Sequence, residues 1–323
     1  MNFIQLLDRS INEKILGRRQ VKVVFPDGED DRVIKACELA LNENIYLPIL
    51  ITSKKHPKLI TIDPNNYSKH NEMLEKFKEI RQNKNTIEEL EKLMKNPIYF
   101  ALLLLEIGEA DTFVGGSSYP SSDIIRASFQ VTRTTPNFKK ASSCMVLNKN
   151  EQLYVFGDVS ANINPTSEDL VEITQQIFDF GSIFNIPKKA ALLSFSTNGS
   201  AKSLEVEKVQ KAVSLLKETS ISDNIEGEMQ FDAAFDLATR KKKFPTSKME
   251  GKINIFVFPD LNAGNIGYKI AQQLGGFLAL GPVLVGLRRP ISDLSRGATW
   301  QDIYNTGIIM ASKVVYDEAK RNK

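Results

Sequence analysis

VKVVFPDGEDDRVIKACELA (residues 21–40) begins as a strand and continues as a helix. The β-branched run VKVVF (21–25) is typical of a short buried strand, and Pro26-Asp27-Gly28 is a turn signal. From Glu29 onward, small and apolar residues recur at helical spacing and would form one buried face: Val33, Ala36, Cys37 and Ala40. The stretch therefore predicts one strand–turn–helix unit of an α/β protein.

Strand-like and helix-like segments alternate along the rest of the chain. We expect strands at 46–52, 110–116, 191–197, 253–260 and 277–286, and helices at 68–83, 86–96, 121–130, 200–218, 264–274 and from about 299. Two adjacent strand-like runs after residue 140 interrupt the alternation, which indicates an antiparallel insertion or the start of a second sheet. The pattern predicts an α/β fold with two domains, a boundary at 134–150 and a cleft between the domains.

Composition and charge exclude several classes of protein. The chain has 323 residues, of which 42% are hydrophobic and 25% charged, as in soluble globular proteins, and this length suggests about two domains. The 42 Lys and Arg residues against 39 Asp and Glu give a net charge of only +3, so no nucleic-acid partner is expected.

Metal, disulfide and membrane signals are weak. Cys37 and Cys144 stand far apart, and His56 and His70 have no second ligand at a suitable spacing. An enzyme here would therefore use carboxylates, lysines or hydroxyls as acid–base groups.

The longest apolar run, at 98–105, is far shorter than the roughly 20 residues of a membrane helix. The N-terminal MNFIQLLDRSINEK is predicted to be an amphipathic helix rather than a signal peptide, so the cytoplasm is the expected compartment and no membrane partner is expected.

The loop GGSSYPSSD (115–123) lies between a predicted strand and a predicted helix. Its small residues allow close backbone approach, a helix start offers free N–H groups, and Arg126 follows one turn later, which together would suit a phosphate. Ser121 or Ser122 is expected to cap the helix. On shape alone, an ordinary capped loop is the favoured interpretation, because neither a P-loop nor a GxGxxG motif is present.

The stretch RRPISDLSRGATWQD (288–302) places a hydroxyl and a guanidinium side by side, at Ser295 and Arg296. Arginine suits phosphate oxygens, and Arg288 and Arg289 add positive charge nearby. Asp302 has two interpretations: a base, or the second half of a capping box that Thr299 begins.

A third segment, FPDLNAGNIGYKIAQQLGG (258–276), has the form of a ligand-facing strand end followed by a helix. Asn262 or Asn265 is expected to cap this helix, and Tyr268 and Lys269 lie in its first turns. The alternative is helix capping with a surface lysine.

Several of these segments together resemble the phosphate acetyltransferase family. The motifs occur in the family's order from near residue 20 to the C-terminus, and they are FPDGEDDRV (25–33), DIIRASFQ (123–130), NPTSEDL (164–170), LLSFSTNGS (192–200), EGEMQFDAA (226–234), FPDLNAGNIGYKIAQQLGG (258–276) and PISDLSRGATWQDI (290–303).

The resemblance implies an acyltransferase of acetate metabolism that moves acetyl reversibly between acetyl phosphate and coenzyme A. It also implies a two-domain fold like that of isocitrate dehydrogenases, with αβα sandwich domains, an active-site cleft between them and a homodimer. One domain would comprise 1–137 plus 283–323, and the other, 138–282, would form the dimer interface. CoA would be a substrate, with no metal and no permanently bound cofactor.

The resemblance also implies roles for individual residues. Ser295, Arg296 and Asp302 match the family's catalytic positions, and the substrate-binding positions would be Arg81, Ser117, Ser121, Arg126, Asn265, Tyr268 and Lys269. The chain departs from the family at Tyr119 and Pro120, where a His and a Ser are usual, and at Val159, where a Cys is usual.

The mechanism expected from these roles is direct attack of the CoA thiolate in a ternary complex. Asp302 would take the thiol proton, Ser295 would orient the attack, and Arg296 would stabilise the developing negative charge. A covalent acyl-enzyme is not expected, because Val159 leaves no thiol there and Cys144 lies outside the motifs.

Three alternatives remain open from the sequence. They are a phosphate butyryltransferase with a larger acyl pocket, a metal- and NAD(P)-dependent decarboxylating dehydrogenase of the same fold, and a non-catalytic acyl-CoA-binding module. The dehydrogenase would need clustered aspartates and a dinucleotide motif, neither of which is recognisable. The three matched catalytic positions argue against the binding module.

Overall fold

The structure is a computed structural model that describes Leu7, residues 20–82 and residues 84–321. The predicted N-terminal helix lies outside the described residues, Leu7 excepted. The chain forms two compact units. We call the unit of Phe138–Gly286 the insert unit, and the unit of the described residues up to Asn137 together with those from Leu287 onward the split unit.

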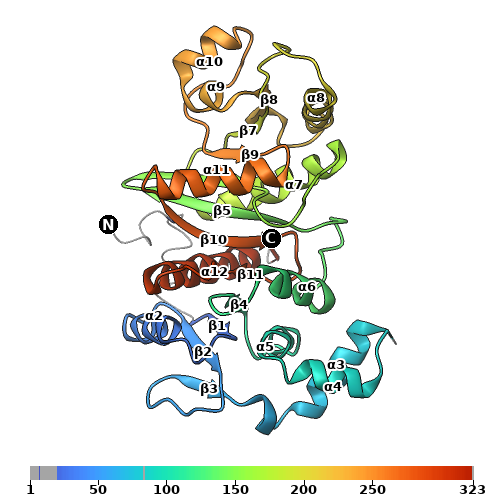
Figure 1. Cartoon of the computed structure of the whole chain (residues 1–323), viewed down its shortest axis with the longest axis vertical. Helices are drawn as coiled ribbons and strands as arrows, with labels where there is room; N and C mark the ends of the chain where they lie inside the picture. Colours follow the sequence, from blue (N-terminus) through green and yellow to red (C-terminus); the bar gives the residue numbers. More distant parts are fainter. Residues whose placement is uncertain (1–6, 8–19, 83, 322–323) are drawn as a thin grey trace. The chain divides into compact units, whose positions relative to one another are not determined.

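The split unit is built on a parallel sheet with the strand order β3-β2-β1-β4-β11. Its strands are β1 (Lys22–Phe25), β2 (Leu47–Ile51), β3 (Ile60–Ile62), β4 (Thr112–Gly115) and β11 (Ile291–Asp293). Its helices are α2 (Asp31–Asn42), α3 (His70–Arg81), α4 (Ile87–Met94), α5 (Pro97–Glu106), α6 (Ser121–Val131) and α12 (Trp300–Arg321). Helix α12 packs against α2 (Figure 1).

The predicted strand–turn–helix unit at 21–40 is confirmed. Strand β1 lies in the middle of the split-unit sheet, between β2 and β4. The α2 residues expected to face inward are the ones that are buried, Val33, Ala36, Cys37 and Ala40. Because β1, β4 and β11 run parallel, the loops that follow them emerge at one edge of the sheet.

The insert unit has a mixed sheet with the order β10-β5-β6-β9-β7-β8. Its strands are β5 (Ser142–Lys149), β6 (Gln152–Gly157), β7 (Ala190–Leu193), β8 (Ile225–Met229), β9 (Ile255–Val257) and β10 (Leu278–Val285). The antiparallel insertion expected after residue 140 is confirmed, because β5 and β6 form an antiparallel hairpin and β10 also pairs with β5 in antiparallel register. Its helices are α7 (Ser167–Phe180), α8 (Leu204–Leu216), α9 (Phe231–Phe235), α10 (Leu237–Lys243) and α11 (Leu261–Gln273).

Both predicted helix caps in these loops were wrong. Helix α6 begins at Ser121 itself, and the residue before it is Pro120, which supplies a suitable φ of −64° but no side-chain cap. Helix α11 begins three residues earlier than expected, because the Asp260 carboxylate caps it by accepting a hydrogen bond from the Ala263 N–H at 2.9 Å. Among the described residues, no helix combines the length and the apolar character needed to cross a bilayer.

Candidate active site

Three loops meet at the carboxyl edge of the split-unit sheet, and Asp27 ties two of them together. This residue follows β1, is 4% exposed, and accepts hydrogen bonds from the backbone N–H groups of Gly116 at 2.9 Å and Ser118 at 2.8 Å. Both amides belong to the loop between β4 and α6 that the sequence marks as a candidate phosphate site. Their N–H groups are therefore already bonded within the protein.

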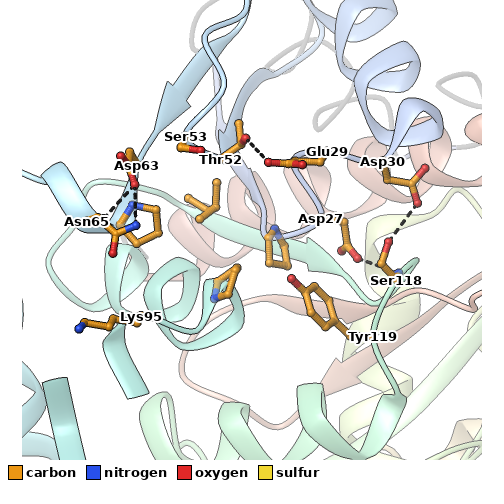
Figure 2. A pocket seen from close by; sticks show the side chains of 15 residues that line it. Asp27, Glu29, Asp30, Thr52, Ser53, Asp63, Asn65, Lys95, Ser118 and Tyr119 are labelled. Atoms are coloured by element: carbon orange, nitrogen blue, oxygen red, sulfur yellow. Dashed lines mark hydrogen bonds between the residues drawn. The ribbon is translucent and has the colours of Figure 1, made fainter. Parts of the chain in front are cut away.

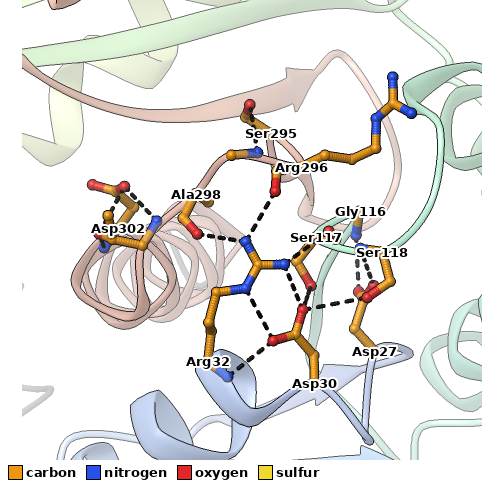
Figure 3. A network of polar contacts seen from close by, with 12 residues as sticks. Asp27, Asp30, Arg32, Gly116, Ser117, Ser118, Ser295, Arg296, Ala298 and Asp302 are labelled. Atoms are coloured by element: carbon orange, nitrogen blue, oxygen red, sulfur yellow. Dashed lines mark hydrogen bonds and ion pairs between the residues drawn. The ribbon is translucent and has the colours of Figure 1, made fainter.

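Asp30 and Arg32 form the centre of a larger polar network (Figure 3). The Asp30 carboxylate accepts hydrogen bonds from the Arg32 side chain at 2.7 and 3.0 Å and from the Ser117 hydroxyl at 3.0 Å. Burial alone would raise the pKa of Asp30, but these bonds outweigh it and lower the pKa to about 2. Ser117 is 3% exposed, so the structure places this predicted substrate contact inside the network.

The same Arg32 side chain holds the loop that carries two of the predicted catalytic residues. Its Nη1 donates to the backbone carbonyls of Arg296 at 2.9 Å and Ala298 at 2.8 Å, and its Nη2 donates to the Ser117 carbonyl at 3.0 Å. The side chains of Ser295 and Arg296 are exposed, and in Figure 3 Arg296 extends away from Arg32. One buried-side anchor thus fixes the backbone of an exposed catalytic loop.

Asp302, the predicted base, is part of a capping box at the start of α12. Its Oδ2 accepts hydrogen bonds from the Thr299 N–H and the Thr299 hydroxyl, both at 2.8 Å, while its own N–H donates to that hydroxyl at 3.2 Å. The capping interpretation of the sequence is confirmed. It does not exclude a second role, because both bonds use one carboxylate oxygen and the residue is only half-buried.

The remaining predicted contacts of the split unit lie on or against α6. Ser121 is exposed at the start of the helix, and Arg126, one turn later, pairs with Asp123 while its side chain stays 60% exposed. Arg81 lies at the end of α3, where its guanidinium donates to Asn85 at 2.8 Å and to the Gln130 carbonyl of α6 at 3.5 Å. Arg126 and Arg81 therefore both belong to the surroundings of one helix.

A pocket of about 480 Å³ opens beside these loops, at the carboxyl ends of β1 and β2 (Figure 2). Tyr119 lines it, and its hydroxyl points into the pocket. Burial, assisted by the charges of Asp27 and Glu29, raises the pKa of this phenol. Tyr119 replaces the family's usual histidine with a neutral hydroxyl donor at this position.

The three predicted contacts on α11 belong to the insert unit. Asn265 donates to the Val159 carbonyl at 3.0 Å, and Tyr268 is 6% exposed within the hydrophobic core of that unit. Lys269 is exposed, and its ammonium lies 4.9 Å from the centre of the Tyr268 ring. The structure thus gives Asn265 and Tyr268 packing roles and leaves Lys269 at the surface.

Sequence reasoning missed the residues that build the network: Asp27, Asp30, Arg32 and the buried Asp293. The first three stand in the motif FPDGEDDRV, so the signal was available, but no role was assigned to them. A cluster of charges directly after a buried strand marks a sheet edge where side chains from several loops converge.

Comparison with known proteins agrees with this architecture. A profile of the family described as phosphate acetyl/butaryl transferase matches residues 6–311. Phosphate acetyltransferase from Bacillus subtilis (strain 168) is 39% identical over 318 residues, covering 95% of this chain and 98% of that protein. The phosphate acetyltransferase of Mycoplasma capricolum is 42% identical over 316 residues, covering 94% of this chain and 97% of that protein.

Solved structures extend the likeness to three dimensions. A phosphotransacetylase from Streptococcus pyogenes has a TM-score of 0.88 at 38% identity, covering 95% of this chain and 97% of the other. A 4-hydroxythreonine-4-phosphate dehydrogenase from Klebsiella pneumoniae shares the fold alone, with a TM-score of 0.52 at 14% identity over 92% of this chain and 99% of the other. The two-domain α/β fold with dehydrogenase-like relatives is thus confirmed, and the chain belongs to the phosphate acetyl/butyryl transferase family.

Proposed function

We propose that this protein is a phosphate acetyltransferase, which moves an acetyl group reversibly between acetyl phosphate and CoA. The observation that carries the proposal is the exposed Ser295-Arg296 loop, whose backbone Arg32 anchors to the 115–121 loop in a member of this family. The anchor supplies what catalysis by positioning needs, a charged group held in a fixed place before the substrate arrives.

The proposed reaction is a direct acyl transfer. The CoA thiolate attacks the carbonyl carbon of acetyl phosphate, a C–S bond forms, and the C–O bond to phosphate breaks, so that phosphate leaves with the electron pair. A free thiol has a pKa of about 8.5, so a base or a positive field is needed near neutral pH. Asp302 would accept the thiol proton and Ser295 would orient the attack.

Arg296 is assigned to the charge that develops on the carbonyl and phosphate oxygens. Its exposed guanidinium is free to reach a ligand, while its backbone carbonyl is fixed by Arg32 at 2.9 Å. Arg126 and Ser121 would hold the phosphate at the start of α6, and Arg81 would add positive charge to the same ligand. Ser117 would act indirectly, through the hydroxyl that it gives to Asp30.

On the insert unit, Asn265, Tyr268 and Lys269 remain proposed substrate contacts, and Lys269 is the one whose side chain is exposed. CoA enters as a substrate, and the proposal requires no bound cofactor. The cytoplasm is the proposed compartment, where CoA and acetyl phosphate are available.

A homodimer that forms through the insert unit is also part of the proposal. Helices α9 and α11 expose large apolar side chains, namely Phe231, Phe235, Ile266, Ile270 and Leu274, which are 45 to 86% exposed. Several of them border an apolar pocket of about 450 Å³ lined by phenylalanines. Contiguous apolar surface of this kind supports self-association.

The proposal is tested by measuring CoA-dependent release of phosphate from acetyl phosphate. Arg296→Ala is expected to lower kcat by about 10²-fold or more. Asp302→Asn keeps an oxygen for the capping bonds but removes the base, whereas Thr299→Ala weakens the cap but keeps the carboxylate. A loss in the first and not in the second would support the base, and near wild-type turnover in Asp302→Asn would remove it from the mechanism.

The acyl chain is the second open choice, because the matching family includes acetyl and butyryl transferases. The relatives at 39% and 42% identity are acetyltransferases, which favours acetyl phosphate. Comparing kcat/KM for acetyl and butyryl phosphate decides between them, and a preference for butyryl phosphate would contradict the proposal.

A further inference from the structure

Asp293 is a buried carboxyl group without a hydrogen-bond partner beside the 115–121 loop. It ends β11 opposite Gly115 of β4 and is 0% exposed. Within the described part of the chain, neither of its carboxyl oxygens makes a hydrogen bond. Its Oδ1 lies only 2.6 Å from the place where a β-carbon on Gly116 would be. An unbonded buried carboxyl is costly, so its place next to this loop calls for a reason.

The second buried carboxylate nearby decides which of the two carries the charge. Asp27 accepts two backbone N–H groups, from Gly116 and Ser118, and such donors favour the ionised form. Asp293 has no such donor. Burial raises the pKa of Asp293 to about 7, the charge of Asp27 raises it as well, and the Ser121 hydroxyl lowers it. Asp293 is therefore the member of the pair that holds a proton near neutral pH.

Ser121 connects this buried group to the protein surface. Its side chain is exposed at the first position of α6, while its hydroxyl is the side-chain group that acts on the Asp293 carboxyl. No side chain caps α6, because Pro120 stands at the cap position. The first turn of this helix thus combines N–H groups and a hydroxyl, which is an arrangement suited to an anion.

We propose that Asp293 is a positioning residue that acts through Ser121. As a neutral acid, Asp293 donates its proton to the Ser121 oxygen, which turns the Ser121 hydrogen outward to an oxyanion at the start of α6. As a carboxylate, Asp293 instead takes the Ser121 hydrogen and places a second negative charge beside Asp27. The inference rests on the proposed function only for the identity of the anion, a phosphate group of the substrate.

The other charged groups of the elements packed against β11 are already paired. Helix α6 contributes Asp123 and Arg126, which pair with one another, and α12 contributes Asp302, which bonds Thr299. Neither element brings a positive charge that acts on Asp293, and the charged group that does act on it is Asp27.

Direct binding of sulfate tests the proposal, because sulfate remains a dianion throughout the pH range. If the anion binds only when Asp293 is neutral, its apparent Kd scales with the neutral fraction, so affinity should fall about tenfold between pH 6 and pH 8. Isothermal titration calorimetry on the whole chain measures this without relying on enzymatic activity.

Two variants give opposite expectations. Asp293→Asn can donate an amide hydrogen to Ser121 at any pH, so its sulfate affinity should change by less than about twofold between pH 6 and pH 8. Ser121→Ala removes the link and should bind sulfate weakly, with the pH dependence lost. Glu106→Gln is the matched control, since Glu106 is a second buried carboxyl whose pKa burial raises, and it should keep the wild-type profile.

A tenfold pH dependence that persists in Asp293→Asn, or in Ser121→Ala should the first variant fail to fold, would overturn the proposal. So would the absence of measurable sulfate binding by the wild-type protein at pH 6. If the predicted sulfate profile is found but no acetyl transfer is detected, the proposed function fails while the role of Asp293 stands.

Discussion

Replacing Arg32 by alanine is expected to reduce catalysis far more than it reduces stability. The substitution removes three hydrogen bonds to backbone carbonyls, those of Ser117, Arg296 and Ala298, together with the pair to Asp30. Each such bond contributes about 0.5–1.5 kcal/mol net, and the low end applies because the Arg32 side chain is 37% exposed. The free energy of unfolding should therefore fall by about 2 kcal/mol.

The catalytic loop should lose its position at the same time. Two of the lost bonds hold the backbone on either side of Gly297, next to Ser295 and Arg296. Because a misplacement of about 1 Å can cost roughly 10²-fold in rate, kcat for phosphate release should fall by about that factor under conditions where the variant is fully folded. Urea unfolding and a steady-state assay at the same temperature separate the two effects.

Lys54→Ala is the matched control for this experiment. Lys54 forms an ion pair with Glu29 in the same unit, but the two side chains are 74% and 53% exposed, so the loss should be at most about 0.5 kcal/mol. Arg32→Ala with wild-type kcat would refute the argument that Arg32 positions the loop. A fall in kcat as large in Lys54→Ala would show that the effect is not specific to the network.

The pH dependence of this stability difference has a definite sign. The pKa of Asp30 is lowered to about 2, below its unfolded value near 3.9, so its pair with Arg32 stabilises the folded state above that unfolded value. This contribution is lost as pH falls through 2. The difference in unfolding free energy between wild type and Arg32→Ala should therefore shrink below about pH 3.

Three further outcomes are expected. Gly116→Ala should cost about 2–3 kcal/mol in urea unfolding, because φ is +112° and the new β-carbon would meet Asp293, whereas Gly108→Ala, with open space and φ +77°, should cost about 1 kcal/mol. Asp293→Asn should match wild type in unfolding free energy below pH 4 and become more stable, by up to about 4 kcal/mol, as pH rises through 7, since a raised folded pKa means that wild type loses stability over that range; a constant difference would contradict the burial argument. Ile270→Lys should shift the protein from dimer to monomer in light scattering, while Leu204→Lys, equally apolar and 82% exposed on α8, should not, and a monomeric wild type would refute the dimer.

The alternation of strands and helices was predictable because it depends on local patterning. Residues 21–40 form the expected strand and helix, and the adjacent strand-like runs form the expected antiparallel hairpin. Boundaries were less predictable. The cap of α11 was missed because Asp260, Asn262 and Asn265 are all good capping residues, and only the position where the helix starts selects Asp260.

The site was predictable as a set of segments but not as a network. The sequence contains both partners of each contact, yet Arg32 and the carbonyl of Arg296 are 264 residues apart. The order of strands in the sheet brings them together, and no local pattern encodes that order. The buried position of Ser117 and the unbonded carboxyl of Asp293 depend on the same packing, so residue type alone could not reveal them.

The pairing of β4 with β11 also affects the order in which the protein is made. Strand β4 is complete by Gly115, but its neighbour, Ile291–Asp293, follows the whole insert unit in the chain. On the ribosome, the apolar edge of β4 therefore stays unpaired while the insert unit emerges and folds. The split unit can close only near the end of synthesis, and a chain interrupted before residue 291 exposes an open sheet edge of the kind that promotes aggregation.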